Sequence, residues 1–398
     1  MGIQSFKGTL LLALILLSPM VAIARNPSLC QASTLIPHDP ILIVGDSDFT
    51  PQNGVTSGLG RADDPYVIEG WDISAENANG IEIRNTDAHF IIRNCHLRDG
   101  RSKYKHGVYF EDVVNGRIDG VVSENNFHGI FVVRFSNGDI ENCIADNNLG
   151  KGIWLWYSNN NTVEDCTARN NNFEDIHLWY SSNNKVINCT IESDDHGITI
   201  DHSDNDTVTN CIVKGNNFGV YIYSSSSSAI TNCTVERNNT GIILVSSNNN
   251  LIAGCSIENN SLGIKINDSS NNNRVHHNSF VNNASQALDY CTNYWDNDYP
   301  SGGNYWSDYV GTDNYRGEDQ DIAGGDGIGD TPYHVSENNL DRYPLLSPII
   351  QPQPGPVSYT IIGIIIAVVV AVGVGALFMV RRVRRGKPPA KTIFFRSG

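Results

Sequence analysis

The chain repeats itself in HGITIDHSDNDTVTNCIVKGNN (residues 196–217), FGVYIYSSSSSAITNCTVERNN (218–239) and TGIILVSSNNNLIAGCSIENNS (240–261), three consecutive stretches of 22 residues. In each stretch a glycine opens a segment of alternating aliphatic residues, and a cysteine follows 14 residues after that glycine. Alternation with period two is typical of β-strands, and the clusters of Asn and Ser between the segments suit tight bends. A short fixed period without a helical pattern predicts a β-solenoid of stacked coils.

The repeat continues in both directions from these stretches. The position of the cysteine, which we call the marker position, recurs every 22 or 23 residues. It holds Cys143, Cys166, Cys189, Cys211, Cys233 and Cys255. Gly70, Cys95 and Gly120 occupy the same position earlier in the chain, and Asn278 occupies it later. We therefore expect an all-β chain that forms a right-handed parallel β-helix of about ten 22–23-residue coils at residues 66–290, stacked about 4.8 Å apart.

The marker cysteines precede an alternating apolar position, as in Cys189-Thr190-Ile191, so we expect their side chains to point inward. Because a buried free cysteine behaves as a small apolar residue, stacked free thiols are the preferred interpretation, and disulfides between adjacent coils are the alternative. Cys30 and Cys291 lie outside this series, near opposite ends of the predicted coils, so we do not expect them to pair.

Both ends of the chain carry export and membrane signals. Residues 1–24 combine one lysine, a short apolar run and an Ala-x-Ala site, which is typical of a signal peptide. Residues 359–380 are uncharged and apolar over 22 positions, enough for a transmembrane helix. The basic segment 381–398 follows directly, so by the positive-inside rule it is cytoplasmic. The sequence thus predicts a single-pass protein of the cell membrane with an extracellular body.

Three further segments complete the predicted organisation. Residues 25–65 precede the coils as an N-terminal cap, 291–346 follow them as an aromatic and acidic C-terminal cap module, and 347–358 form a proline-rich linker to the membrane. The formal net charge of −16 argues against nucleic acid and against polyanionic substrates. Eight Asn-x-Ser/Thr sequons would allow N-glycosylation of an exported protein.

Aromatic residues recur at the outward-facing positions that follow the repeated glycine. A strip of such rings along successive coils suits contact with sugar rings, although a covering loop or partner, or the general preference of aromatic residues for strands, would explain it too. The candidate carbohydrate-binding residues are Tyr109, Phe131, Trp154, Trp156, Trp179, Tyr180, Tyr221 and Tyr223.

Acidic residues and histidines gather near the middle of the strip, and paired carboxylates can catalyse glycoside hydrolysis. The candidate catalytic residues are Asp175, His177, Asp195 and Asp201, and we expect Asp175 and His177 to share one strand face with Trp179. Lys151 and Arg134 are too few and too scattered for the basic groove of a polysaccharide lyase. Since acidic residues on an acidic surface are commonly only solvated, a non-catalytic role is the preferred interpretation.

The C-terminal cap module holds Asp319, Asp321, Asp326 and Asp330 among glycines. Oxygen ligands on a glycine-rich loop suit Ca²⁺, and an acidic surface turn is the alternative. The aromatic residues of the same module supply enough apolar area to cover the core of the last coil.

Together with the coils, the motifs Tyr299-Pro300-Ser301-Gly302-Gly303-Asn304-Tyr305-Trp306 and Gly325-Asp326-Gly327-Ile328-Gly329-Asp330 carry a family resemblance. They resemble the NosD-like, periplasmic copper-binding β-helix family, within the wider group of carbohydrate-binding and sugar-hydrolase β-helices, in the variant found on archaeal surface proteins. The resemblance implies copper, but the sequence does not support it, because Met1, Met20 and Met379 are the only methionines and no His-x-x-x-His or Met-rich cluster occurs.

The resulting functional hypothesis is a membrane-anchored extracellular β-helix that binds carbohydrate or a cell-envelope partner without catalysis. One alternative is an exported polysaccharide-degrading enzyme, either a glycoside hydrolase or a lyase, that uses the central acidic cluster. A second alternative is a structural spacer of the cell envelope.

Overall fold

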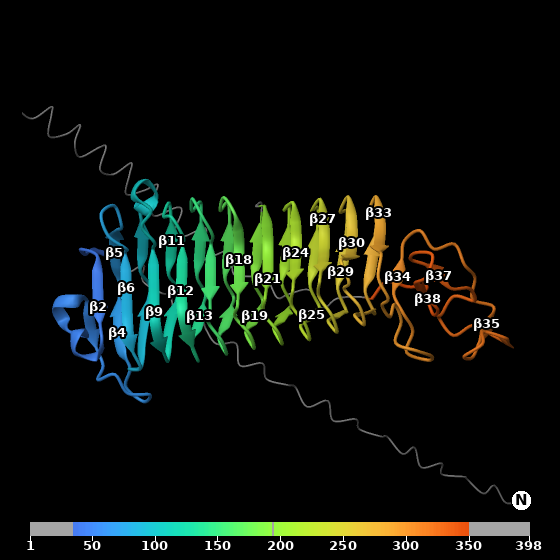
Figure 1. Ribbon diagram of the computed structural model, residues 1–398, viewed down its shortest axis with the longest axis horizontal. Helices are drawn as coiled ribbons and strands as arrows, with labels where there is room; N and C mark the ends of the chain where they lie inside the picture. The colour runs from blue at the N-terminus through green and yellow to red at the C-terminus, as the bar shows by residue number, and fades with distance from the viewer. Residues whose placement is uncertain (1–34, 193–194, 350–398) are drawn as a thin grey trace, which may run out of the picture. The chain divides into compact units, whose positions relative to one another are not determined.

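The computed structural model describes residues 35–192 and 195–349. Three parallel sheets, which we call A, B and C, wind around one apolar core (Figure 1). Each of the ten coils from Tyr66 to Asp289 gives one strand to sheet C, then one to sheet A and then one to sheet B. This arrangement confirms the predicted parallel β-helix and its number of coils. A short N-terminal segment precedes the coils, and a C-terminal cap module follows them.

The strands of each sheet are two to seven residues long and pair in register with the next coil. Sheet A contains β1 (Ile36–Pro37), β5 (Trp71–Ser74), β8 (His96–Arg98), β11 (Val122–Glu124), β14 (Ile144–Asp146), β17 (Thr167–Arg169), β20 (Thr190–Glu192), β23 (Ile212–Lys214), β26 (Thr234–Glu236), β29 (Ser256–Glu258), β32 (Ser279–Val281) and β34 (Tyr305–Trp306). Sheet B contains β2 (Ile41–Val44), β6 (Ile81–Thr86), β9 (Val108–Val114), β12 (Ile130–Ser136), β15 (Ile153–Trp156), β18 (Glu174–Trp179), β21 (His196–Asp201), β24 (Phe218–Tyr223), β27 (Thr240–Val245), β30 (Leu262–Asn267) and β33 (Ser285–Asp289). Sheet C contains β3 (Val55–Ser57), β4 (Tyr66–Glu69), β7 (Phe90–Arg93), β10 (Gly116–Asp119), β13 (Asp139–Glu141), β16 (Thr162–Glu164), β19 (Lys185–Ile187), β22 (Thr207–Thr209), β25 (Ala229–Thr231), β28 (Leu251–Ala253) and β31 (Arg274–His276).

The core follows from alternation along the strands. In β15, for example, Ile153 and Leu155 are fully buried, while Trp154 and Trp156 on the other face remain partly exposed. Because strands pair in register, Ile176 lies on Ile153 and Ile198 lies on Ile176, so that each inward residue packs on its equivalent in the next coil. Apolar burial of this kind is the main stabilising contribution to the fold.

The corners between sheets are held by ladders of buried polar side chains. In the ladder between sheets A and B, the backbone N–H of Asn126 donates to the Oδ1 of Asn148, and that of Asn148 donates to the Oδ1 of Asn171. A second ladder lies between sheets B and C, where the backbone N–H of Asn161 donates to the Oδ1 of Asn184. These bonds satisfy backbone groups that the turns would otherwise bury without a partner.

The marker cysteines occupy the corner between sheets C and A. Seven of them, from Cys95 to Cys255, are buried as free thiols, which confirms their inward orientation and excludes disulfides between these coils. Each thiol donates to a carbonyl of the preceding coil, as Cys211 does to Val186 at 3.6 Å. Burial raises the pKa of Cys95 to about 11 and that of Cys211 well above its ordinary value. Cys291 is a free, partly buried thiol, and Cys30 lies outside the described residues.

Each end of the stack of coils has its own cover. At the N-terminal end, the short 3-10 helices η1 (Asp46–Asp48) and η2 (Pro51–Asn53) precede β3, which pairs antiparallel with β4. At the C-terminal end, Trp295 and Trp306 are buried against Phe280 of β32, and Tyr333 stacks on Trp306 at 4.1 Å. The two-stranded sheets β35–β36 (Tyr315–Arg316, Ile322–Ala323) and β37–β38 (Tyr333–His334, Leu340–Asp341) complete this module.

Several predicted features fall outside the described residues. These are the signal peptide at 1–24, the transmembrane helix at 359–380 and the basic tail at 381–398. Within the described part of the chain, no helix has the length and apolar character needed to cross a membrane. Two sequon asparagines, Asn238 and Asn283, are buried in the ladder between sheets A and B, where their amides donate to carbonyls, so the folded chain does not present them for glycosylation.

Candidate functional site

The outward face of sheet B carries the aromatic and acidic candidates in three parallel columns. The strand register places Trp154 beside His177 and Thr199, and Trp156 beside Trp179 and Asp201. A third column, one position before the repeated glycine, brings Lys151, Glu174 and His196 together. We call these nine residues, three from each of three successive coils, the central grid: Lys151, Trp154, Trp156, Glu174, His177, Trp179, His196, Thr199 and Asp201.

The aromatic rings of the strip stack on one another along the direction in which the coils stack. Phe131 and Trp154 lie 4.3 Å apart between ring centroids with 12° between their planes, and Trp156 and Trp179 lie 5.2 Å apart at 14°. Because each ring covers a face of its neighbour, the strip presents mainly ring edges to the solvent. The faces are therefore less available for sugar stacking than the sequence suggested, and part of the role of these rings is to hold adjacent coils together.

Other predicted members of the strip lie on either side of the grid. Tyr109 contacts Phe131 on the N-terminal side, and Tyr221 and Tyr223 form a tilted pair on the C-terminal side. Tyr180 is 39 % exposed and stacks on Tyr157 at 5.1 Å. These residues extend the aromatic surface over further coils without touching the centre of the grid.

His177 lies at the centre of the grid and is surrounded by charged groups. The Nζ of Lys151 donates a hydrogen bond to His177 Nδ1 and forms an ion pair with Glu174 Oε2 at 2.7 Å. On the other side of the ring, His177 Nε2 lies 3.8 Å from Asp201 Oδ2, which is too long for a direct hydrogen bond. The side chain of His177 is only 6 % exposed. The grid therefore holds a buried imidazole between a cation and two carboxylates.

The environment shifts the pKa values of four side chains of the grid, namely Lys151, Glu174, His177 and Asp201. Burial lowers the pKa of His177 and that of Lys151. Burial alone would raise the pKa of Glu174, but His177 and Lys151 outweigh it and hold that pKa below its usual value. The pKa of Asp201 is likewise lowered, because His177 and His202 outweigh the effect of burial. The lowered pKa values keep Glu174 and Asp201 ionised at neutral pH, and burial favours the neutral form of His177.

Buried polar atoms around His177 lack hydrogen-bond partners. Within the described part of the chain, the indole nitrogens of Trp154 and Trp156 and the Nε2 of His177 are shielded from solvent and bond to no protein atom. Buried polar groups are satisfied in most structures, and exceptions cluster at binding and catalytic sites. These three nitrogen atoms belong to side chains on two adjacent coils of the grid.

The structure separates two of the four catalytic candidates from this centre. Asp175 does not share the outward face with His177, because it replaces the repeated glycine at the corner, where a side chain points into the core. It is fully buried, and its Oδ1 accepts from the amide of Asn171 in the ladder between sheets A and B. Asp195 lies at the rim, 55 % exposed, with Asn217 donating to its Oδ1.

Lys151 is the grid member that the sequence did not reveal as a partner. It precedes the repeated glycine and so lies outside the alternating positions, but the regular spacing of Lys151, Glu174 and His196 is a usable signal. The same column continues to His128 and His106, whose rings stack at 5.1 Å. Burial lowers the pKa of His128 to about 3 and that of His106 to about 4, so both are neutral.

The calcium candidates do not converge in the C-terminal cap module. The carboxylate of Asp330 accepts from the backbone N–H groups of Asn314 and Tyr315, and Asp326 accepts from that of Ile328. Within residues 35–192 and 195–349, no group of three or more His, Cys, Asp or Glu side chains is arranged to hold a metal ion. A Ca²⁺ site that also uses Asp319 and Asp321 therefore stays a prediction that would need rearrangement of this loop.

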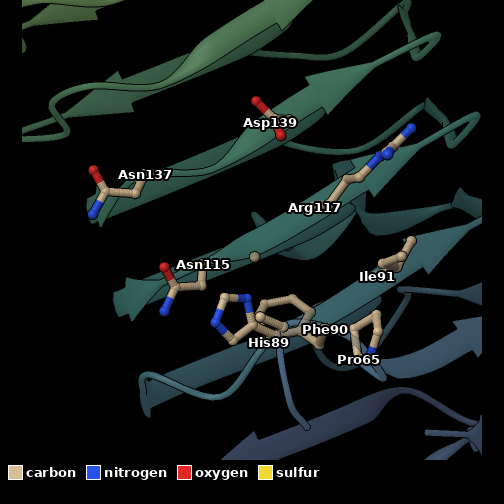
Figure 2. A pocket seen from close by; sticks show the side chains of 10 residues that line it. Pro65, His89, Phe90, Ile91, Asn115, Arg117, Asn137 and Asp139 are labelled. Carbon is tan, nitrogen blue, oxygen red and sulfur yellow. The ribbon is translucent and has the colours of Figure 1, made fainter.

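A shallow hollow of about 210 Å³ lies on sheet C (Figure 2). His89, Asn115, Arg117, Asn137 and Asp139 line it from successive coils. Arg117 is already engaged there, since it forms ion pairs with Asp119 and Glu141. The hollow belongs to a different sheet from the central grid and does not contribute to it.

Comparison with protein families gives one match that covers most of the coils. The family described as periplasmic copper-binding protein (NosD) matches residues 64–228 and 174–311. Among curated proteins, no sequence matches this chain significantly.

The described residues do not fit the copper that this family description implies. Copper favours clustered imidazole, thiolate or thioether ligands, whereas the ladder cysteines point into the apolar core. His106 and His128 stack face to face, and His128 Nδ1 accepts from the backbone N–H of Lys151.

Solved structures share the fold at low sequence identity. A mutant of the periplasmic alginate epimerase AlgG aligns with a TM-score of 0.50 and 11% identity over 65% of this chain and 77% of its own. The A-module of mannuronan C-5 epimerase AlgE4 from Azotobacter vinelandii gives 0.46 and 12% over 65% and 89%. The catalytic domain of a GH87 α-1,3-glucanase in complex with tetrasaccharides gives 0.45 and 13% over 60% and 55%.

The match to the AlgG mutant, with a TM-score of 0.50, supports the parallel β-helix fold and nothing finer. The two ranges of the family match together span residues 64–311, which is more than half of the chain. On that evidence, the chain belongs to the family of periplasmic copper-binding (NosD) proteins.

Proposed function

We propose that this chain binds carbohydrate through the outward face of sheet B, at a site centred on the central grid, and that residues 359–380 hold it at the outer face of a cell membrane. The observation that carries the proposal is the group of shielded donors on Trp154, Trp156 and His177 that bond to no protein atom in the described chain. Sugars offer many hydroxyl oxygens that can accept from such donors, and aromatic side chains contact their C–H groups.

Two further facts support a carbohydrate ligand. The aromatic surface extends beyond the grid over several coils, from Tyr109 to Tyr223, which suits a polymer better than a small molecule. The fold also occurs in proteins whose names refer to alginate epimerisation and α-1,3-glucan cleavage. The edge-on rings favour contact through N–H and C–H edges over stacking on ring faces.

The alternatives differ in what they require of this face. A polysaccharide hydrolase needs a carboxylic acid that keeps its proton, whereas the pKa values of both Glu174 and Asp201 are lowered. A structural spacer does not need shielded donors without partners. Recognition without turnover therefore agrees best with the lowered pKa values and with the donors that lack partners.

A glycan array probed with the full-length chain in detergent tests the proposal. Binding of at least one polysaccharide by the wild type is expected, with at least tenfold loss in the variants Trp156→Ala and Trp179→Ala. Tyr290→Ala is the matched control, because Tyr290 is 69 % exposed and lies beyond the tenth coil. No binding by a folded wild type, or equal losses in the control, would contradict the proposal.

A further inference from the structure

The space between His177 and Asp201 has a specific hydrogen-bonding character. Lysine carries donors and no acceptor, so the contact from Lys151 fixes His177 Nδ1 as an acceptor. In the neutral ring the proton then resides on Nε2, which faces Asp201 Oδ2 across 3.8 Å. One side of this gap is therefore a donor and the other is a carboxylate acceptor.

The carboxylate of Asp201 is held in position for this role. His202 Nδ1 lies 2.6 Å from Asp201 Oδ1, which leaves Oδ2 directed towards His177. The Asp201 side chain is 22 % exposed, so a ligand can approach it from solvent. His177 Nε2 is shielded by the rings of Trp154 and Trp179, whose centroids both lie 6.2 Å from the imidazole. A ligand that reaches Nε2 must therefore displace one of these rings.

We propose that the His177–Asp201 gap is a recognition site for the exocyclic hydroxyl group of a neutral sugar residue, and that it selects against the matching uronic acid, whose carboxylate replaces that hydroxyl. This inference rests on the proposed function and names its ligand class. A hydroxyl can accept from His177 Nε2–H and donate to Asp201 Oδ2 at the same time. A carboxylate has no proton to donate, and an ammonium group has no lone pair to accept.

The charges of the grid point to the same class. Lys151 is the cation of the grid, and its charge is already paired with Glu174 at 2.7 Å. A uronate carboxylate at His177 would lie beside the charge of Asp201, with Asp195 at the rim nearby, and like charges at such distances repel. A neutral hydroxyl avoids this repulsion and gains a charge-assisted hydrogen bond.

Matched oligosaccharides test the proposal, because they differ only at the exocyclic carbon. Mannohexaose with hexamannuronate, and cellohexaose with its uronate counterpart, are titrated into the full-length chain while tryptophan fluorescence is recorded. We expect at least one neutral hexasaccharide to bind with a change in fluorescence, as a flanking ring moves. Its uronate partner should bind at least tenfold more weakly.

Two variants assign the effect to the gap. Asp201→Asn should weaken binding of the neutral sugar about tenfold and reduce the discrimination against the uronate, because it removes the charge and keeps the size. His177→Ala should lose binding, and His177→Gln should recover part of it, since the Gln amide places a donor near the position of Nε2. Unchanged melting temperatures verify that the variants fold.

The outcomes distinguish a failure of carbohydrate binding from a failure of the hydroxyl site. If the wild type binds no glycan on the array or in the titrations, the proposed function falls. If it binds glycans but prefers the uronates, or if Asp201→Asn leaves the affinity unchanged, the hydroxyl site is wrong while carbohydrate binding stands.

Discussion

Asp206 lies in the ladder between sheets B and C, where the neighbouring coils have Asn184 and Ser228. Its Oδ1 accepts from the backbone N–H of Asn184 at 2.7 Å, but its Oδ2 is buried and has no hydrogen-bond partner in the described chain. At the equivalent position of other coils an amide nitrogen donates to a carbonyl, as Asn184 Nδ2 does to Ser158 at 3.0 Å and Asn250 Nδ2 to Ser225 at 3.1 Å. An ionised carboxylate would face such a carbonyl with no proton to donate.

Burial accordingly raises the pKa of Asp206 from 3.8 to about 8. A carboxyl with a raised pKa in the folded state contributes stability that is complete below pH 3.8 and is lost as the pH rises towards 8. Because pH 7 lies about 3 units above the unshifted pKa of 3.8, the penalty at pH 7 is about 4 kcal/mol relative to a group with an unshifted pKa. The Asp206→Asn variant avoids this penalty and supplies the amide donor that the neighbouring coils have.

We therefore expect Asp206→Asn to stabilise the chain by about 2–4 kcal/mol at pH 7 and to be nearly neutral at pH 4. Urea denaturation followed by circular dichroism at both pH values measures this effect. Asp204→Asn is the control, because Asp204 belongs to the same coil but is exposed. If wild type and Asp206→Asn lose stability equally between pH 4 and pH 8, Asp206 is ionised in the folded chain and the reasoning is refuted.

Three further predictions concern the ladder and the cap. Cys211→Ala should cost roughly 1–3 kcal/mol as a small cavity, whereas Cys211→Asp should prevent folding; rapid thiol labelling of the native ladder cysteines would contradict their burial. Asp341→Ala should destabilise the cap by about 2–4 kcal/mol, because Asn304 N–H and Trp306 Nε1–H both lose their acceptor; chemical unfolding followed by tryptophan fluorescence measures this, and an equal effect of Asp298→Ala at the exposed rim would speak against it. If Asp319, Asp321, Asp326 and Asp330 bind Ca²⁺, a chelator should lower the melting temperature and Ca²⁺, but not Mg²⁺, should restore it; an unchanged melting temperature with no metal in native mass spectrometry would rule the site out.

The sequence predicted the coils well because their determinants are local and repeated. Alternation fixes which residues face inward, and the constant spacing of positions such as Cys189 and Cys211 fixes the register between coils. The same reasoning placed His177 and Asp201 on the outward face of adjacent coils. Sequence patterns therefore sufficed for the fold and for the face on which His177 and Asp201 lie.

The remaining errors arose where the alternation stops. At the corner that Asp175 occupies, side-chain direction is set by the turn, and the alternating pattern no longer applies. Lys151 lies just outside the alternating segment for the same reason. The carboxylates of the cap bind backbone N–H groups from distant residues, as Asp330 does from Tyr315, and no spacing rule anticipates such contacts. The orientation of the rings along the strip decides whether their faces or their edges meet the solvent, and it also depends on packing alone.

The asparagine ladders are directional, and this polarity has a consequence for how the chain can change in length. Each backbone donor belongs to one coil and its acceptor to the next, so the coil at the C-terminal end always needs a successor. In the cap module, Asn293 accepts from the backbone N–H of Asn273 and Asn304 accepts from that of Asn278. Asp341 accepts in turn from the backbone N–H of Asn304. Duplication or deletion of a whole 22-residue unit between the ends leaves every donor matched, whereas loss of the cap orphans a coil. The length of this protein can thus change by whole coils during evolution, provided that the C-terminal cap module is retained.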